Sequence, residues 1–86
     1  FAEAHYWLGR MYLVNNRPDD AQKQFATALE QHGNNYPEAL FYQGIAQEQL
    51  GQPANAMTSF QSVVDQVRDS GLAREAEAAI ARLKQP

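Results

Sequence analysis

The apolar side chains of this chain recur at the three- and four-residue spacing of a helix. This spacing places them on one face of a helix, where they can be buried together. The clearest stripe is formed by Leu72, Ala76, Ala79, Ile80 and Leu83. No segment alternates apolar and polar residues in the way that predicts a half-buried strand. The pattern therefore predicts an all-α protein.

Proline and glycine mark where these helices begin and end. Pro18, Pro37 and Pro53 each suit the first turn of a helix, because the N–H that proline lacks has no intrahelical partner there. After the second helix, Gly33 or Asn34 is the expected left-handed cap. Together these signals predict helices over residues 2–15, 18–31, 37–50, 53–69 and 72–84.

The chain contains an internal repeat. The segment RPDDAQKQF at residues 17–25 aligns with QPANAMTSF at residues 52–60, which lies 35 positions later. An aromatic pair recurs at the same offset, as Tyr6-Trp7 and Phe41-Tyr42. Self-similarity at such a period is typical of stacked supersecondary units. We therefore expect each repeat to be one helical hairpin.

Two glycines occupy helix interiors at equivalent positions of the repeats. Gly9 and Gly44 each cost their helix roughly 1 kcal/mol relative to alanine. The absence of a side chain predicts that another element comes very close at both positions. We expect the backbone of the second helix there, with Phe25 and Phe60 filling the space beside it.

Six residues of the first repeat form a spaced signature: Leu8, Gly9, Tyr12, Ala21, Phe25 and Ala28. This signature resembles the tetratricopeptide repeat, whose unit is about 34 residues. The second repeat keeps the glycine and the phenylalanine, but Gln43, Gln47 and Val63 replace the leucine, tyrosine and small residue of the pattern. Tyr36 is the extra residue that lengthens the period to 35.

The resemblance implies a right-handed stack of helical hairpins, an α–α superhelix. It covers almost all of a single domain, residues 1–86, with repeats at 2–35 and 37–70 and a capping helix at 72–84. Because Phe1 already begins a helical pattern, we expect the chain to be a segment of a longer protein. The segments AHYWLG and AEAAIARL are also similar to Tol-Pal-associated periplasmic bacterial repeat proteins, which leaves the cytoplasm and the bacterial periplasm both open.

The resemblance also implies a binding surface, because the family holds extended or helical peptides in a concave groove lined by its first helices. The residues expected to line that groove are Tyr6, Arg10, Leu13, Phe41, Ile45 and Ile80. The competing interpretation is that some of them only pack between neighbouring helices. Trp7 and Tyr42 form a possible second interface, although packing on a neighbouring helix is the simpler interpretation.

Two functions therefore remain open. The first is a protein–protein interaction scaffold that binds a partner peptide or helix in the concave groove. A groove of tyrosine, phenylalanine and isoleucine with the single basic residue Arg10 suits an apolar or mixed segment, since aromatic and arginine side chains are common interface anchors. The second is a structural or self-assembly module that stacks on further repeats or dimerises.

Composition narrows the classes of function. Seven basic and ten acidic residues give a net charge of −3 without a basic patch, which argues against nucleic-acid binding. The chain has no cysteine, and His5 and His32 lie far apart in the sequence, so we expect neither a metal site nor a cofactor. It has no catalytic constellation and no run of about 18 apolar residues, so we expect neither an enzyme nor a membrane-inserted protein.

Overall fold

The computed structural model describes residues 1–85 as five helices, with no strand among them. The helices are α1 (Ala2–Val14), α2 (Pro18–Gln31), α3 (Pro37–Gln49), α4 (Pro53–Gln66) and α5 (Gly71–Lys84). Three of them begin at the predicted prolines, Pro18, Pro37 and Pro53. The predicted left-handed cap after α2 is confirmed, since Gly33 has φ 68° and Asn34 has φ 65°.

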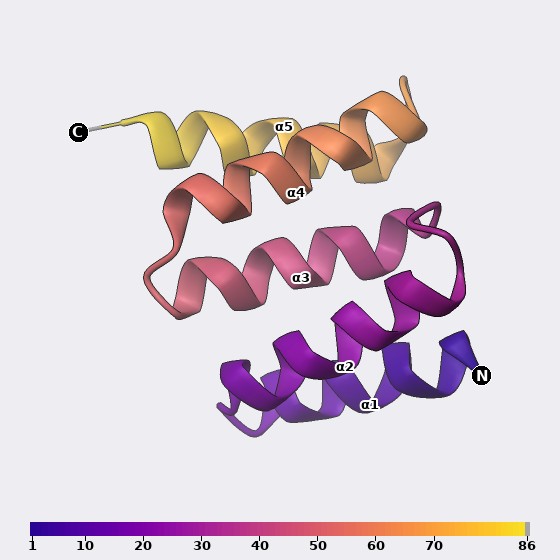
Figure 1. The fold of residues 1–86 in the computed structure, drawn as a ribbon. Coiled ribbons are helices and arrows are strands. Elements are labelled where there is room, and N and C mark those ends of the chain that lie inside the picture. The colour runs from indigo at the N-terminus through magenta and orange to yellow at the C-terminus, as the bar shows by residue number, and fades with distance from the viewer. Residues whose placement is uncertain (86) are drawn as a thin grey trace.

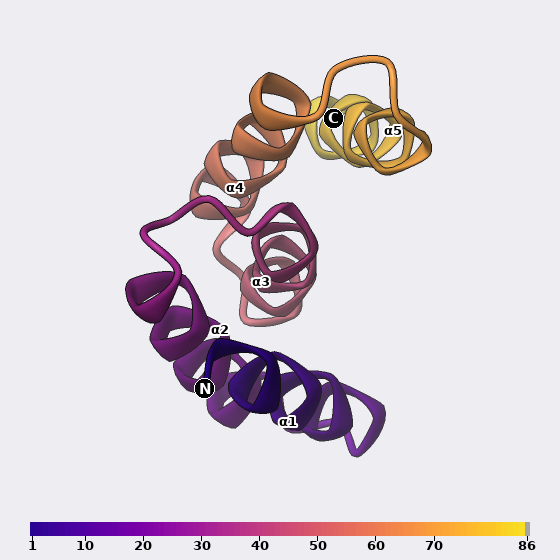
Figure 2. The same ribbon diagram turned by 90° about the vertical axis from the view of Figure 1, so that its right-hand side faces the viewer.

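The helices form a curved stack of antiparallel hairpins. Each helix packs against the next one along the chain, so that α1 pairs with α2 and α3 with α4, while α5 covers α4 (Figure 1). Viewed along the stack, the first helices α1 and α3, together with α5, line the inner side of the curve, and α2 and α4 line the outer side (Figure 2). The predicted all-α hairpin stack is confirmed.

The end of α4 differs from the prediction. The helix ends at Gln66 instead of reaching Asp69, which has a left-handed φ of 65° and cannot continue it. Ser70 follows as the N-cap of α5, because its Oγ accepts a hydrogen bond from the Ala73 N–H at 3.0 Å. The fifth helix therefore begins at Gly71, one residue earlier than predicted.

A phenylalanine ring occupies the space beside each helix-interior glycine. A Cβ at Gly9 would lie 2.7 Å from Cε1 of Phe25, and a Cβ at Gly44 would lie 2.7 Å from Cε1 of Phe60. Both rings are fully buried. The expected neighbours are therefore confirmed, but the close element is the ring itself and not the backbone of the second helix. The face of the flat ring packs against the bare Cα, which no larger residue would allow.

Two of the three departures of the second repeat from the family signature, Gln47 and Val63, are accommodated in the core, whereas the buried Oε1 of Gln43 has no hydrogen-bond partner among the described residues. Gln47 is buried, and its Oε1 accepts a hydrogen bond of 2.7 Å from the hydroxyl of Ser59 on α4. The pair satisfies a polar group that would otherwise cost free energy. Val63 is fully buried, so it fills the place of the second small residue.

The fifth helix covers the outer end of the second repeat. Its alanines Ala73, Ala76 and Ala79 are buried, and the larger stripe residues Leu72, Ile80 and Leu83 pack at the edge of the core. The opposite side of α5 carries the exposed charged residues Arg74, Glu75 and Glu77, whereas Arg82 pairs with Glu48 of α3. A polar outer face is what the terminal unit of a repeat stack needs in water.

Candidate functional site

The six residues expected in the groove lie on the three helices of the inner side. Tyr6, Arg10 and Leu13 belong to α1, Phe41 and Ile45 to α3, and Ile80 to α5. We call this inner side, lined by α1, α3 and α5, the concave face. The six side chains differ in how far they remain accessible there.

Tyr6 is the most deeply packed of the six. Only 6% of its surface is exposed. Its ring centroid lies 5.3 Å from that of Tyr36, 6.1 Å from Tyr42 and 6.2 Å from Phe25. Burial raises the pKa of the Tyr6 phenol, and the nearby Arg10 charge partly opposes this. Tyr6 therefore belongs mainly to the core, as the competing interpretation holds for part of the row.

Arg10 is held by aromatic rings. Its guanidinium carbon lies 4.5 Å from the ring centroid of Tyr42, 5.1 Å from Trp7 and 5.9 Å from Tyr6. These distances fall within the range of cation–π attraction. The stack joins α1 to α3 and fixes the position of the one charged residue in the row. Arg10 takes part in no ion pair among the described residues.

The four apolar members of the row are partly exposed: Leu13, Phe41, Ile45 and Ile80. Each packs at its base against the buried core. The Phe41 ring, for example, meets the ring of Phe60 edge-on, with 5.5 Å between their centroids. Near them, Arg82 of α5 forms an ion pair with Glu48 of α3. These four apolar side chains are therefore held by contacts with the core and remain partly exposed to solvent.

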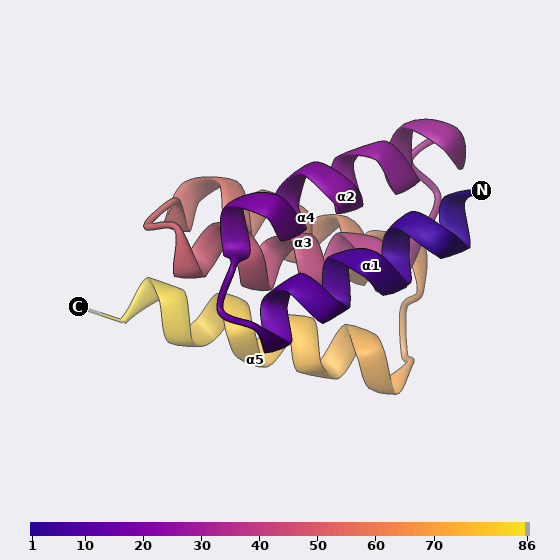
Figure 3. The same cartoon turned by 90° about the horizontal axis from the view of Figure 1, so that it is seen from below.

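Trp7 and Tyr42, the possible second interface, have different surroundings. Tyr42 is partly buried and stacks on Phe25, with 6.4 Å between ring centroids. Trp7 is 55% exposed and shares the outer face of α1 with Met11, 60% exposed, and Val14, 86% exposed. Figure 3 shows α1 and α2 in front of the remaining helices, at one end of the stack. The prediction includes Trp7 but not its two neighbours, although their four- and three-residue spacing marks the stripe.

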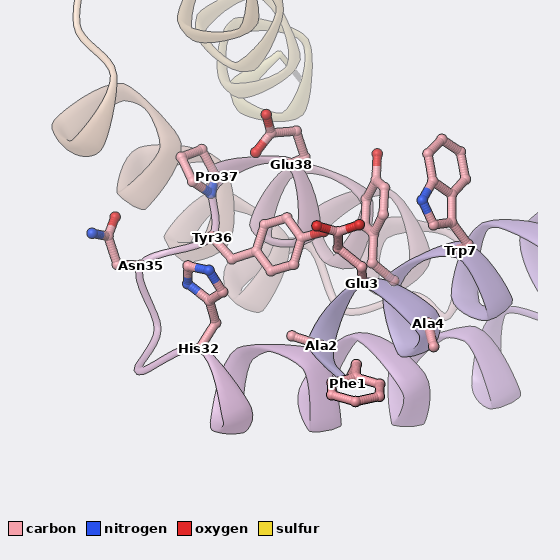
Figure 4. A pocket seen from close by; sticks show the side chains of 11 residues that line it. Phe1, Ala2, Glu3, Ala4, Trp7, His32, Asn35, Tyr36, Pro37 and Glu38 are labelled. Carbon is pink, nitrogen blue, oxygen red and sulfur yellow. The ribbon is translucent and has the colours of Figure 1, made fainter.

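An open cavity of about 1000 Å³ lies where the start of α1 meets the α2–α3 loop and the start of α3 (Figure 4). Its lining includes four aromatic rings, two carboxylates and an imidazole: Phe1, Tyr6, Trp7, Tyr36, Glu3, Glu38 and His32. Of these, the prediction includes only Tyr6 and Trp7. The one sequence signal for this site is Tyr36, the residue that lengthens the repeat.

The two histidines of the chain have different contacts. His5 Nδ1 is hydrogen-bonded to Gln24 Oε1 at 2.8 Å, and the His32 ring packs on Tyr36 with 4.9 Å between centroids. No group of three or more histidine, cysteine or acidic side chains is placed to hold a metal ion in this part of the chain. Nor does any of the helices described have the length and apolar character needed to cross a membrane.

The curved stack of hairpins defines the class as a helical repeat protein. A family model described as tetratricopeptide repeat matches residues 8–71, well over half of the chain. The chain belongs to the tetratricopeptide repeat family. A search of curated proteins found no match to it. Repeats of this family are generally protein–protein interaction modules and are typically non-catalytic.

Proposed function

We propose that this chain binds a segment of a partner protein, extended or helical, on its concave face. The observation that supports the proposal is the set of partly exposed apolar side chains on the helices that line that face: Leu13, Phe41, Ile45 and Ile80. Arg10 lies in the same row and supplies one fixed positive charge. Such a surface suits an apolar or mixed segment.

The physical argument rests on preorganisation. Aromatic and arginine side chains carry much of the binding free energy at protein interfaces. Here Phe41 is held by Phe60 and Tyr42, and Arg10 by Tyr42, so little side-chain entropy is lost when a partner docks. Tyr6 supports Arg10 from the core. No cofactor takes part, because the function is the presentation of a preformed surface.

Selection from a displayed library of random peptides tests the proposal. Peptides that the chain enriches are titrated into isotope-labelled protein, and backbone amide shifts are followed by NMR. We expect the largest shifts on α1 and α3, near Phe41 and Ile45. Ile45→Ala and Arg10→Gln should weaken binding while the protein stays folded, although each variant loses contacts that stabilise the stack.

Lys23→Ala and Gln61→Ala are the matched controls, because both residues are exposed on the outer helices α2 and α4. These variants should bind the selected peptides as the parent does. Shifts centred on α2 and α4, or a library that yields no binder above background, would refute the concave face as the site.

Self-assembly is the second candidate function, and the exposed outer face of α1 favours it. Trp7, Met11 and Val14 leave more apolar surface open than single scattered residues do. Sedimentation velocity across a concentration series measures this property directly. An association that Met11→Glu abolishes would support it, whereas a monomer at all concentrations would remove it.

A further inference from the structure

One wall of the cavity at the start of α1 consists of aromatic rings. Tyr6 contacts the rings of both Tyr36 and Trp7, with centroid distances of 5.3 Å and 5.0 Å. Trp7 is more than half exposed, so its ring is accessible from solvent. The faces of aromatic rings carry negative charge density and attract cations.

Two carboxylates share this cavity with the rings. Glu3 lies in the first turn of α1 and Glu38 in the first turn of α3, and both are exposed. Favourable interaction with the helix dipoles explains their presence in part. Neither carboxylate takes part in an ion pair among residues 1–85. Burial raises the pKa of the Tyr36 phenol, and the negative charges of Glu3 and Glu38 raise it further.

The same aromatic cluster already holds one guanidinium group. Arg10 packs over Tyr42, Trp7 and Tyr6, but neither Arg10 nor Tyr42 lines the cavity. On the Tyr42 side of Tyr6, therefore, the Arg10 guanidinium already makes cation–π contacts with the rings. On the Tyr36 side, rings and carboxylates lie together, and no arginine or lysine side chain is among the residues that line the cavity.

We propose that this cavity binds the guanidinium group of an arginine side chain carried by a partner protein segment. The planar group packs against the wall formed by Tyr36, Tyr6 and Trp7, and Glu3 and Glu38 accept its hydrogen bonds. The open volume of about 1000 Å³ admits the side chain together with its backbone. The site adds to the proposed function a requirement for a basic residue in the partner, at a place outside the apolar row.

A small cationic probe tests the cavity without a partner protein. N-acetyl-arginine amide is titrated into the full chain, and the indole N–H resonance of Trp7, the only tryptophan, reports binding. The Phe1 amino group is acetylated beforehand, since Phe1 lines the cavity and its ammonium group would compete. N-acetyl-citrulline amide serves as the neutral probe of the same shape. We expect saturable shifts with the arginine probe and much weaker ones with the citrulline probe.

Charge-removing variants locate the interaction. Glu3→Gln and Glu38→Gln should each weaken the arginine probe about two- to fivefold, as expected for one exposed ion pair. Glu77→Gln removes the same charge from the exposed side of α5 and should leave binding unchanged. Equal shifts from both probes, no shift with arginine, or equal weakening by all three variants would overturn the proposal. Because the selected peptides report on the concave face, those outcomes would leave the proposed function standing.

Discussion

Two equivalent helices of this molecule, α1 and α3, have different surroundings. Met11 and Ala46 occupy the same position of the repeat, yet Met11 is 60% exposed and Ala46 is fully buried. Trp7 is mostly exposed, whereas its equivalent Tyr42 stacks on Phe25 of α2. The difference arises because α2 packs against α3, while no described helix covers the same face of α1. Burial at this position is set by the neighbouring repeat.

The contacts within each repeat show no such difference. A Cβ added to the glycine would lie 2.7 Å from its phenylalanine ring in both repeats, at Gly9 and at Gly44. Contacts within a hairpin therefore recur with the sequence, whereas contacts between hairpins depend on what stands next to them. The predictions below test this division.

Removal of either phenylalanine ring should have the largest effect. Phe25→Ala and Phe60→Ala should each lower the free energy of unfolding by about 3–5 kcal/mol, because both rings are fully buried and leave a cavity. Urea titration followed by circular dichroism measures the loss. If the alanine variants do not fold, Phe25→Leu and Phe60→Leu provide a milder pair. A large loss in one repeat with none in the other would contradict the equivalence.

Filling the glycine positions should have the next largest effect. Gly9→Leu and Gly44→Leu should each destabilise toward the upper end of the range of about 1–3 kcal/mol for overpacking, although leucine favours helix. Gly71→Ala is the control, because nothing lies within 4 Å of its added Cβ. The control should leave the urea midpoint unchanged or raise it slightly. A more stable Gly9→Leu variant would mean that the Phe25 ring moves aside freely.

Exchanging residues between the equivalent positions tests the comparison directly. Ala46→Met should destabilise toward the lower end of about 1–3 kcal/mol, because the methionine would have to fit beneath α2. Met11→Ala should change the melting temperature little, because the side chain is mostly exposed. Differential scanning calorimetry measures the melting temperature of both variants. Similar effects at the two positions would show that the local sequence, and not the neighbouring helix, determines the cost.

Loss of the cap of α5 should have the smallest effect. Ser70→Ala removes the hydrogen bond to the Ala73 N–H and should cost about 1 kcal/mol, whereas Ser70→Asn should retain most of the stability. Thermal unfolding followed by circular dichroism measures both variants. Equal stability of the alanine variant and the parent would mean that α5 is held by its alanines alone.

The fold was predictable because helical spacing, prolines and the repeat all indicate the same hairpins. The end of α4 was not, since the left-handed conformation of Asp69 depends on how the chain must turn to reach Ser70. The sequence predicts the close approach at Gly9, but the expected neighbour, the backbone of the second helix, is wrong. A glycine in a helix interior indicates that another group lies close, but it does not indicate which group.

The candidate sites were predictable only in part. Helical spacing groups Tyr6 with Arg10, but the cover over Tyr6 comes from Tyr36 and Tyr42, which are distant in the sequence. The cavity was not predicted for the same reason. It is built from a loop residue and the ends of two helices, and helical periodicity does not place such residues relative to one another.

The nearest-neighbour packing of the stack also bears on how the chain folds. Each helix contacts its neighbours along the chain. The contacts between helices that are not neighbours reach only from α1 to α3 and from α3 to α5. Short loops therefore close at low entropic cost, which favours fast folding. In a linear array of this kind, opening starts most easily at the ends. The central helix α3, which contacts all four of the others, is then the last to lose its structure, and it carries Phe41 and Ile45.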